Sequence, residues 1–345
     1  MQKNNPRINT AFKRALAVLM ALSMGAVAAC SATGGRPREN ANGEGGAAGG
    51  VDTPRYTVAM ISHGAPGDTF WDLVRRGAED AAKKNNIELR YASSPQAPDQ
   101  ANLVRNAIDS QVDGIALTMP TAEALGPIAR RATEQGIPTV SLNSGMSHYE
   151  RYGVSAFFGQ DEHVAGEAAG ERLAKDGAKK VKVLCVIHEQ GNPSQEARCG
   201  GAKKALQAKG GGTLETLYVN GMDMTSVTST VQAKLAQDRN IDWVLNLVAP
   251  VALASVNSAR AAGSDAKIVT FDTDAELVTA IKDGKVQWAV DQQPYLQGYL
   301  AVDALWLAKR NGAIPGGGQP VFTGPAFVDA SNVDKIEDAA KEGLR

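Results

Sequence analysis

Hydrophobic and polar positions follow two different rhythms along most of this chain. From Tyr56 onward, short β-branched and aliphatic runs are followed by longer stretches in which apolar residues recur every three or four positions. The first rhythm predicts strands and the second predicts amphipathic helices. Strands and helices that alternate in this way are typical of parallel sheets with crossover helices, so the pattern predicts an α/β fold.

The alternation is organised in two successive series. The first series predicts strands over 56–62, 87–92, 114–118 and 139–142 and helices over 70–85, 100–112 and 123–135. A second series begins after Phe157 and Phe158, with strands over 180–187, 214–218, 243–247, 267–271 and 286–290, helices over 163–175, 195–209, 225–237, 251–262 and 295–310, and a short helix from 274. Because the second series repeats the first, we expect two doubly wound, Rossmann-like halves. In such sheets ligands bind outside the carboxyl ends of the strands.

Residues 1–29 have the pattern of a lipoprotein signal peptide. They consist of a basic region with Lys3, Arg7, Lys13 and Arg14, an apolar run over 15–26, and small residues over 27–29 that lead into Cys30. The apolar run is too short to span a bilayer comfortably, and cleavage before Cys30 leaves this cysteine for lipidation. The alternatives are a plain signal peptide and a short membrane anchor. They explain the small residues directly before a cysteine less well than a lipoprotein signal does.

Residues 30–53 are predicted to be a lipid-anchored linker. Glycines stand at 34, 35, 43, 45, 46, 49 and 50, and large apolar residues are almost lacking. Such a composition is typical of a flexible tether. We therefore expect a globular body that is held at the extracytoplasmic face of the cell membrane.

Net charge bears on whether the protein binds nucleic acid, and chain length bears on the number of domains. The chain has 36 Lys plus Arg and 37 Asp plus Glu, and loss of the four basic signal residues leaves 32 against 37, a net charge of about −5. This balance gives no indication of a nucleic-acid partner. The remaining length is sufficient for two domains of ordinary size, and no second apolar run is long enough to predict another membrane span.

Two further cysteines lie in the body of the protein. Cys185 stands in a predicted strand and Cys199 in the helix predicted directly after it. An extracytoplasmic compartment permits disulfides, and a bridge between a strand and the following helix is geometrically feasible. The alternative is two buried free thiols, and the sequence leaves both readings open.

Standard catalytic signatures are not found where this fold would place them. The turn over 62–68, after the first predicted strand, lacks the G-x-G-x-x-G spacing that brings backbone against a pyrophosphate. A P-loop, a G-x-S-x-G elbow and an H-E-x-x-H pair are not found either, and the four histidines do not cluster in the sequence. We therefore expect a binding protein without cofactor or metal rather than an enzyme.

Polar and aromatic residues follow the first predicted strand, namely Ser62, His63, Asp68, Phe70 and Trp71. Neighbouring positions of a helix lie on different faces, so we expect one of the two aromatic rings to face the cleft, where it can cover the C–H face of a sugar or polyol. The alternative is that both rings pack between the helix and a neighbouring loop.

Other predicted strands of the first half also end in candidate contacts. Met119 follows the third strand, and Asn143 and Ser144 follow the fourth. The Asn143 amide offers both a hydrogen-bond donor and an acceptor to a ligand. Its alternative role is that of a turn former.

Three residues of the second half are candidates for ligand contacts. Thr273 and Glu276 match a T-x-x-E capping box, which leaves Asp272 free to accept hydrogen bonds from hydroxyls. Arg198 lies in the helix that follows 192–194, and its planar fork could clamp ring or hydroxyl oxygens, the alternative being a surface ion pair. Gln292 precedes the point where the chain is expected to return to the first half, and its alternative role is to stabilise a hinge.

In these features the chain resembles the type I periplasmic binding proteins of ABC importers, in the branch that includes ribose- and galactose-binding proteins. The resemblance covers about 55–333, with matching stretches over 58–71, 114–121, 136–143, 161–175, 198–206, 268–273 and 289–294. It implies two lobes joined by three crossings. The lobes are then expected over 54–160 plus 293–323 and over 161–292 plus 324–345.

The resemblance also implies a set of ligand contacts. They fall on Ser62, Asp68, Phe70, Trp71, Met119, Asn143, Ser144, Arg198, Met222, Val248, Asp272 and Gln292. Several of these residues depart from the ribose-binding pattern, which has a polar amide at the positions of Met119 and Val248, an aromatic residue at that of Met222, and an Asp-Arg pair at those of Asn143 and Ser144. Fewer hydrogen-bonding groups favour a ligand other than ribose, such as a polyol, a deoxysugar or a modified pentose.

The function implied by the resemblance is that of a lipid-anchored, monomeric receptor. It captures a monosaccharide or polyol between the lobes, closes by hinge motion and delivers the ligand to an ABC permease. The alternative is a sensory sugar-binding lipoprotein that docks on a chemoreceptor or sensor kinase. Repressors of the lactose-repressor family share these lobes, but they need an N-terminal helix-turn-helix where this chain has a signal and a linker.

Overall fold

The computed structural model describes residues 53–177 and 180–345. The predicted signal peptide, the lipidation site Cys30 and nearly all of the predicted linker lie outside these residues. Within the two described ranges, no helix is both long enough and apolar enough to cross a bilayer.

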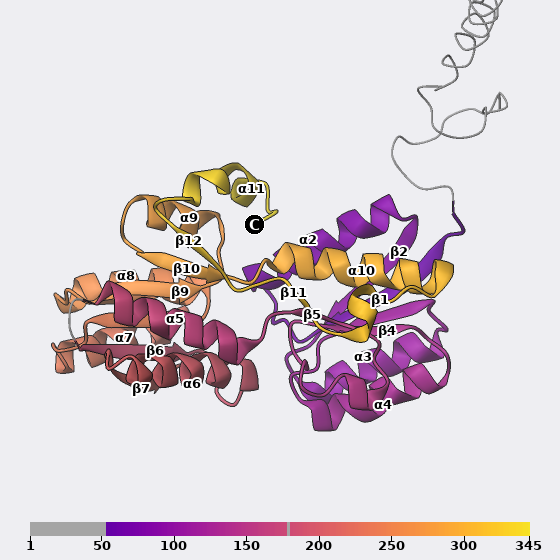
Figure 1. The fold of residues 1–345 in the computed structure, drawn as a ribbon, viewed down its shortest axis with the longest axis horizontal. Helices are drawn as coiled ribbons and strands as arrows, with labels where there is room; N and C mark the ends of the chain where they lie inside the picture. Colours follow the sequence, from indigo (N-terminus) through magenta and orange to yellow (C-terminus); the bar gives the residue numbers. More distant parts are fainter. Residues whose placement is uncertain (1–52, 178–179) are drawn as a thin grey trace, which may run out of the picture. The chain divides into compact units, whose positions relative to one another are not determined.

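The first lobe is built on a six-stranded sheet in the order β11-β5-β4-β3-β1-β2 (Figure 1). Its strands are all parallel: β1 (Tyr56–Ser62), β2 (Ile87–Ser93), β3 (Gly114–Leu117), β4 (Thr139–Leu142), β5 (Phe157–Gly159) and β11 (Val321–Phe322). One face is covered by α2 (Thr69–Lys84) and α10 (Pro294–Asn311), and the other by α3 (Ala97–Asp109) and α4 (Ala122–Glu134).

The second lobe has an equivalent sheet in the order β12-β10-β9-β8-β6-β7. Its strands are β6 (Val181–Ile187), β7 (Gly212–Tyr218), β8 (Trp243–Asn246), β9 (Lys267–Phe271), β10 (Trp288–Asp291) and β12 (Ala326–Asp329). Only β12 is antiparallel to its neighbour. One face carries α5 (Glu162–Asp176) and α6 (Pro193–Ala208), and the other carries α7 (Met224–Gln237), α8 (Ala249–Ala262), α9 (Ala275–Lys282) and α11 (Glu337–Lys341).

The predicted α/β fold class with two doubly wound lobes is confirmed, and three crossings join the sheets. They run from β5 to α5, from β10 to α10, and from β11 to β12. The strand predicted over 286–290 instead begins at Trp288, because the Val286 amide still donates to the Ala280 carbonyl at the end of α9. The strands β5, β11 and β12 were not predicted.

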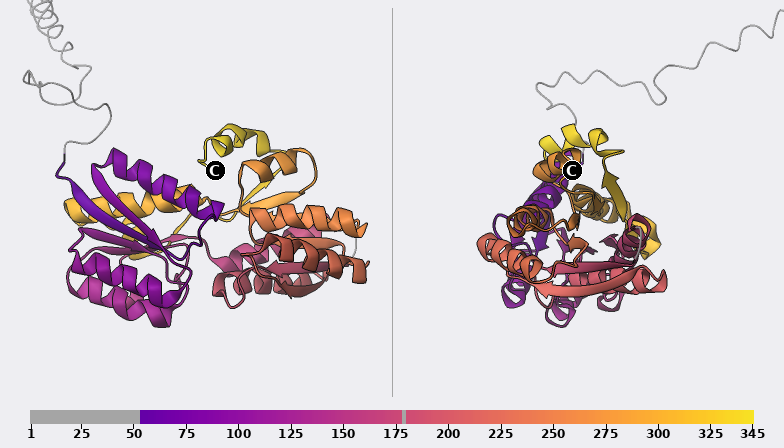
Figure 2. Two further views of the ribbon diagram at one scale, coloured as in Figure 1. Left: turned by 180° about the vertical axis from the view of Figure 1, so that it is seen from behind. Right: turned by 90° about the vertical axis from the view of Figure 1, so that its left-hand side faces the viewer.

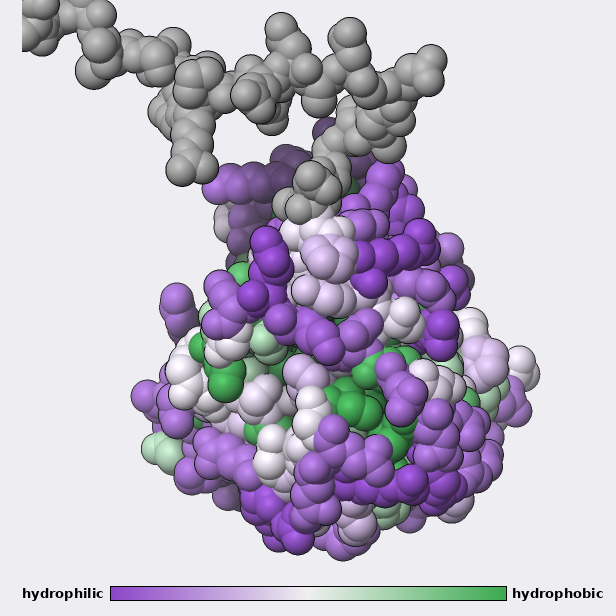
Figure 3. Space-filling model, turned by 90° about the vertical axis from the view of Figure 1, so that its right-hand side faces the viewer, coloured by the Kyte–Doolittle hydropathy of each residue, from purple (hydrophilic) through white to green (hydrophobic). Residues whose placement is uncertain are grey.

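Apolar side chains fill both faces of each sheet, as expected of parallel strands that helices cover on both sides. Every residue of β3, β4 and β8 is buried. The outer surface is mostly hydrophilic on the face that Figure 3 shows, with limited hydrophobic areas. The site therefore rests on two rigid sheets whose carboxyl ends are fixed by a packed core.

Each lobe contains one helix pair whose backbones approach closely at a glycine. In the first lobe, a Cβ added to Gly77 of α2 would lie 1.9 Å from the carbonyl oxygen of Tyr295 in α10. In the second lobe, a Cβ added to Gly166 of α5 would lie 2.3 Å from the carbonyl oxygen of Arg198 in α6. The helices α10 and α5 each follow one of the crossings between the two lobes that Figure 2 shows. The glycine contacts therefore hold the helix after two of the three crossings against its own lobe.

The sulfur atoms of Cys185 and Cys199 are bonded to each other. The bridge joins β6 to α6 across a Cα–Cα distance of 6.0 Å, and both residues are buried. Of the two readings that the sequence left open, the structure has the disulfide. The bridge fixes the α6 residue that directly follows Arg198.

The glycine contact between α2 and α10 leads to a stability prediction. We expect Gly77→Ala to lower the free energy of unfolding by about 1–3 kcal/mol, because the added methyl group forces the two helix backbones apart. Chemical denaturation measures this loss. The matched control is Gly200→Ala in α6, where an added Cβ meets nothing within 4 Å.

The control variant should be as stable as the parent or gain up to about 1 kcal/mol from helix propensity. Equal losses in the two variants would contradict the assigned role of close packing at Gly77.

Candidate ligand-binding site

A cavity lies at the carboxyl ends of strands from both sheets. Its empty volume, including space open to solvent, is about 410 Å³. It is lined by His63, Asp68, Phe70, Trp71, Asn143, Ser144, His188, Glu189, Asn192, Ser194, Gln195, Arg198, Leu247, Val248, Asp272 and Gln292. Most residues that the sequence singled out therefore come together here.

The first lobe contributes an aromatic wall at the N-terminus of α2. The Phe70 and Trp71 rings meet edge to face with centroids 5.1 Å apart, and the His63 ring lies 4.7 Å from Trp71. Both rings are buried, and both line the cavity. One ring was expected to face the cleft, and the structure places the second ring in the lining as well. The two residues lie in the first turn of α2, where the end of the helix rather than one side of it borders the cleft.

Two titratable groups accompany this wall. Asp68 is the N-cap of α2, with its Oδ1 accepting a hydrogen bond from the Phe70 amide at 3.0 Å. Burial raises the pKa of Asp68 to about 6, and the Glu189 carboxylate from the other lobe adds to this shift. His63 Nδ1 lies 2.7 Å from the Thr118 hydroxyl, and burial lowers the pKa of His63 to about 4. His63 is therefore neutral at neutral pH.

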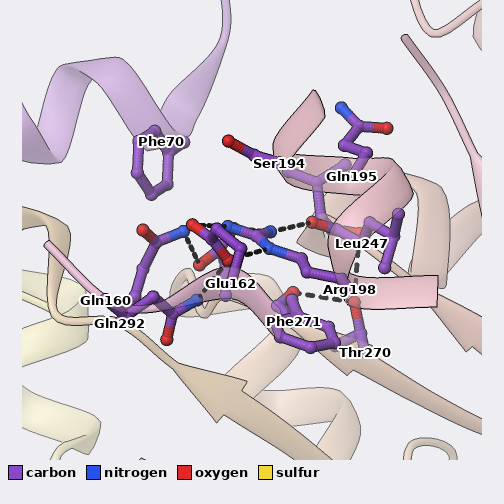
Figure 4. Close-up of polar contacts among 12 residues, drawn as sticks. Phe70, Gln160, Glu162, Ser194, Gln195, Arg198, Leu247, Thr270, Phe271 and Gln292 are labelled. Carbon is purple, nitrogen blue, oxygen red and sulfur yellow. Dashed lines mark hydrogen bonds and ion pairs between the residues drawn. The ribbon is translucent and has the colours of Figure 1, made fainter. Parts of the chain in front are cut away.

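The second lobe contributes a buried guanidinium. Arg198 donates from Nε and Nη2 to the two carboxylate oxygens of Glu162, at 2.5 and 3.0 Å (Figure 4). The side chains are only 6% and 10% exposed, so the alternative of a surface ion pair does not hold. Burial alone would lower the pKa of Arg198, but the Glu162 carboxylate outweighs burial and the pKa lies above its usual range.

The remaining guanidinium nitrogen, Nη1, contacts two other residues that line the cavity. Arg198 Nη1 donates to the Leu247 carbonyl at 3.2 Å and lies 3.8 Å from Asp272 Oδ2. The guanidinium also stacks over the Phe271 ring, 4.7 Å from its centroid. The sequence did not single out Glu162, because its contact depends on how α5 packs against α6. A charge-bearing residue directly after a crossing was the only available signal.

Asp272 follows β9 in a left-handed backbone conformation, with φ of 63°. Burial raises its pKa to about 7, against the opposing effects of Arg198 and a hydrogen bond from Gln292. The predicted capping box is wrong. Helix α9 begins one residue later than the box requires, and Asp274 is its N-cap, accepting from the Leu277 amide at 2.8 Å. Asp272 is nonetheless free of a capping role, as expected.

Gln292 connects the two lobes at the second crossing. Its Nε2 donates to Asp272 Oδ1 at 2.8 Å, and its Oε1 accepts from Asn143 Nδ2 at 3.2 Å. Asn143 follows β4 as Asp272 follows β9, and it has the same left-handed conformation with φ of 61°. Gln297 donates both to Gln292 Oε1 and to the Thr323 hydroxyl of the third crossing. The ligand cavity and the hinge therefore share one hydrogen-bond network.

His188 and Gln195 form a second polar pair at the end of β6. Gln195 Oε1 accepts from the backbone amides of His188 and Glu189, which directs its NH₂ group toward His188 Nε2, 3.1 Å away. Burial lowers the pKa of His188 to about 3, so the ring is neutral and carries its proton on Nδ1. Both residues line the cavity but were not singled out from the sequence. The rule that ligands bind beyond strand ends could have found them.

Three expected contacts lie elsewhere. Ser62 is buried and shares a hydrogen bond with the Tyr91 hydroxyl at 2.8 Å. Met119 is buried and lines a neighbouring cavity instead. Met222 is 70% exposed on the loop before α7 and does not line the cavity. A ligand contact by Met222 remains a prediction from the resemblance.

The neighbouring cavity shares Asn143, Ser144 and Ser194 with the first and has an empty volume of about 850 Å³. It is lined by residues of both lobes. Within residues 53–177 and 180–345, no group of three or more His, Cys, Asp or Glu side chains is arranged to hold a metal ion.

The fold and the cavity define a class of protein, namely a two-lobed solute-binding protein with its ligand site at the strand ends of both lobes. A family comparison agrees, since residues 58–312 match the model of the periplasmic binding protein domain. The chain belongs to this family. The resemblance to type I periplasmic sugar-binding proteins of ABC importers is confirmed.

Several relatives share most of the chain. The ribose import binding protein RbsB of Haemophilus influenzae is 28% identical over 236 residues, which cover 68% of this chain and 79% of that protein. RbsB of Bacillus subtilis is 23% identical over 298 residues, covering 85% and 92%. The crystal structure of a carbohydrate transporter from Acidothermus cellulolyticus in complex with myo-inositol is 46% identical, with a TM-score of 0.81, and covers 85% of this chain and 100% of that one.

The buried ion pair leads to a second stability prediction. We expect Glu162→Gln to lower the free energy of unfolding by about 3–5 kcal/mol, because it leaves the Arg198 charge buried without its main partner. Chemical denaturation gives the value. The matched control on the same helix is Glu171→Gln, which breaks an exposed pair with Lys209.

The control variant should lose at most about 1 kcal/mol. A loss in Glu162→Gln as small as that of the control would contradict the central structural role given to the pair.

Proposed function

We propose that this chain is the substrate-binding receptor of an ABC importer for a cyclic polyol of the inositol type or a closely similar monosaccharide. The observation that carries the proposal is the pairing of an aromatic wall from one lobe with a carboxylate and guanidinium wall from the other. The similarity to the myo-inositol complex, at 46% identity over the full length of that chain, supports the choice of cargo.

The chemistry of the cavity suits a ring that carries hydroxyls around its edge. Phe70 and Trp71 offer apolar ring faces to the C–H faces of such a ring. Asp272 accepts from hydroxyls, and Asn143 and Gln292 can both donate and accept. A cyclic polyol satisfies both walls at once, because its ring faces are apolar and its edge is polar.

The departures from the ribose-binding pattern support the same choice. Ser144 stands where that pattern has an arginine, and Val248 stands where it has an amide. Val248 is buried at the rim of the cavity and offers only an apolar contact. Ribose would lose hydrogen bonds at these positions, whereas the apolar surface of Val248 suits the C–H groups of a less polar ring.

We expect the two lobes to close on the ligand, because each lobe supplies a different set of contacts to it. The aromatic wall belongs to the first lobe, and the carboxylate and guanidinium wall with Asp272 and Arg198 belongs to the second. A ligand therefore touches both walls fully only when the cleft is closed. A ligand that binds the closed form better shifts the population toward it. The closed form is the species that we propose docks on the permease.

The last part of the proposal concerns how the protein is attached to the membrane. Cleavage before Cys30 and lipidation of that cysteine would hold a monomeric receptor at the extracytoplasmic face, with residues 30–53 as the tether. A sensory role in which the closed form docks on a chemoreceptor or sensor kinase is the second candidate, since it uses the same closure. No step of the proposed function requires catalysis, and the relatives are named for import and binding.

A ligand screen tests the proposed cargo directly. We expect myo-inositol to stabilise a protein comprising residues 54–345, by about 2.7 kcal/mol at 100 times its dissociation constant. Thermal unfolding against inositols, aldoses, deoxysugars and purine nucleosides gives the comparison. Stabilisation by nucleosides alone, with no response to any polyol or sugar, would count against the proposal.

The contact assigned to Asp272 leads to a separate prediction. We expect Asp272→Asn to weaken cyclitol binding by roughly tenfold or more, because a charged acceptor is replaced by a neutral one of the same shape. Asn tolerates the left-handed conformation, so the fold should be retained. Isothermal titration calorimetry measures the affinity, and unfolding experiments check the fold. Asp265→Asn, at an exposed position, is the control and should bind like the parent.

A further inference from the structure

Carboxylate side chains outnumber positively charged side chains around the cleft. The first cavity is lined by the carboxylates of Asp68, Glu189 and Asp272 and by a single guanidinium, that of Arg198. The chain as a whole has nearly equal numbers of acidic and basic residues, 37 against 36. The excess of carboxylates is therefore a local property of the cleft and not a consequence of overall composition.

The one guanidinium is already neutralised. Two of its nitrogens donate to both oxygens of Glu162, and the third donates to the Leu247 carbonyl. The two histidines of the cavity add no charge, since burial lowers the pKa of His63 to about 4 and that of His188 to about 3. No positive charge is left over to balance the remaining carboxylates.

The neighbouring cavity, through which the cleft continues, extends the same imbalance. It adds the carboxylates of Glu123 and Asp161 and the imidazoles of His148 and His163, and among the described residues that line it there is neither lysine nor arginine. Low-dielectric walls of one sign of charge concentrate the electrostatic field in a cleft. A cation is therefore drawn in, and an anion is repelled.

Asp68 and Glu189 are the carboxylates best placed to receive a cation. They belong to different lobes, and both line the first cavity. Asp68 accepts from the Phe70 amide, and Glu189 accepts from Asn192 Nδ2 at 2.5 Å. Within the part of the chain that the structure describes, neither carboxylate forms a salt bridge. Closing the cleft brings two like charges together unless a ligand lies between them.

We propose that the preferred cargo carries a protonated amine in place of a hydroxyl, as in an aminocyclitol or amino sugar, and that the ammonium group lies between Asp68 and Glu189. This inference rests on the proposed function, because it assumes the same ring in the same cavity. An ammonium group offers three donors and a positive charge, whereas a hydroxyl offers one donor. Hydrogen bonds between charged groups are about twice as strong as neutral ones.

Calorimetric titration of residues 54–345 with a matched set of ligands tests the inference. The set consists of myo-inositol, inosamines that differ in which hydroxyl is replaced by an amine, and an inositol monophosphate. We expect at least one inosamine to bind about tenfold more tightly than myo-inositol, and the phosphate to bind at least a hundredfold more weakly. Added salt should reduce the preference for the amine. D-glucosamine against D-glucose gives the same comparison for a pyranose.

Two variants locate the ammonium group. Asp68→Asn keeps a good N-cap and Glu189→Gln keeps an acceptor for Asn192, so both should fold. Each should lose most of the preference for the amine over the neutral ring. The control is Glu134→Gln, which removes an exposed carboxylate at the end of α4 and should retain the full preference.

The outcomes separate this inference from the proposed function. If myo-inositol binds and no inosamine binds more tightly, the inference is overturned while the proposed function stands. An amine preference that survives both variants overturns the assignment to Asp68 and Glu189. If no cyclitol or sugar binds, charged or neutral, the proposed function fails as well. A preference that disappears in either variant but persists in the control supports the inference.

Discussion

The buried pair of Arg198 and Glu162 is the interaction on which the rest of this structure depends. Taking a guanidinium out of water costs several kcal/mol unless a carboxylate compensates it with good geometry. Glu162 does so with two nearly parallel hydrogen bonds. The pair requires α5 and α6 to approach closely, and Gly166 permits this approach. Since Glu162 is the first residue of α5 after the crossing from β5, the guanidinium that lines the cavity is held by a residue next to the hinge.

The two lobes place equivalent residues opposite each other and give them different chemistry. Asn143 and Asp272 follow equivalent strands in the same left-handed conformation, and both hydrogen-bond to Gln292. His63 and His188 likewise follow β1 and β6. The aromatic rings, however, belong to one lobe and the guanidinium to the other. In the proposed function, a ligand would gain apolar contact from one wall and polar contact from the other, which would make closure dependent on the ligand.

Much of the fold could be predicted from the periodicity of apolar residues. Part of the site could be predicted from the rule that ligands bind at the carboxyl ends of strands. Asp272, Asn143 and Gln292 could be predicted because each directly follows a strand, and a parallel sheet brings strand ends to one edge. Glu162 could not, since its partner is chosen by the packing of two helices. The cap of α9 was misplaced because Thr273 and Asp274 are both good caps, and only the tertiary position of the helix decides between them. Met222 was placed by resemblance alone, and its loop leaves it exposed.

The charge of such a cleft can change without a change of fold. In the ribose-binding pattern an Asp-Arg pair stands where this chain has Asn143 and Ser144, so carboxylate and guanidinium disappear together and the charge at that point stays balanced. Asp68 and Glu189 then tip the balance toward negative charge, because the cleft has no second guanidinium to neutralise them. A carboxylate that loses water on closure must be paired or protonated. Burial accordingly raises the pKa of Asp68 to about 6 and that of Asp272 to about 7. A ligand that supplies hydrogen-bond donors or a positive charge would stabilise the charged forms of these carboxylates, which would couple recognition to Asp68 and Asp272.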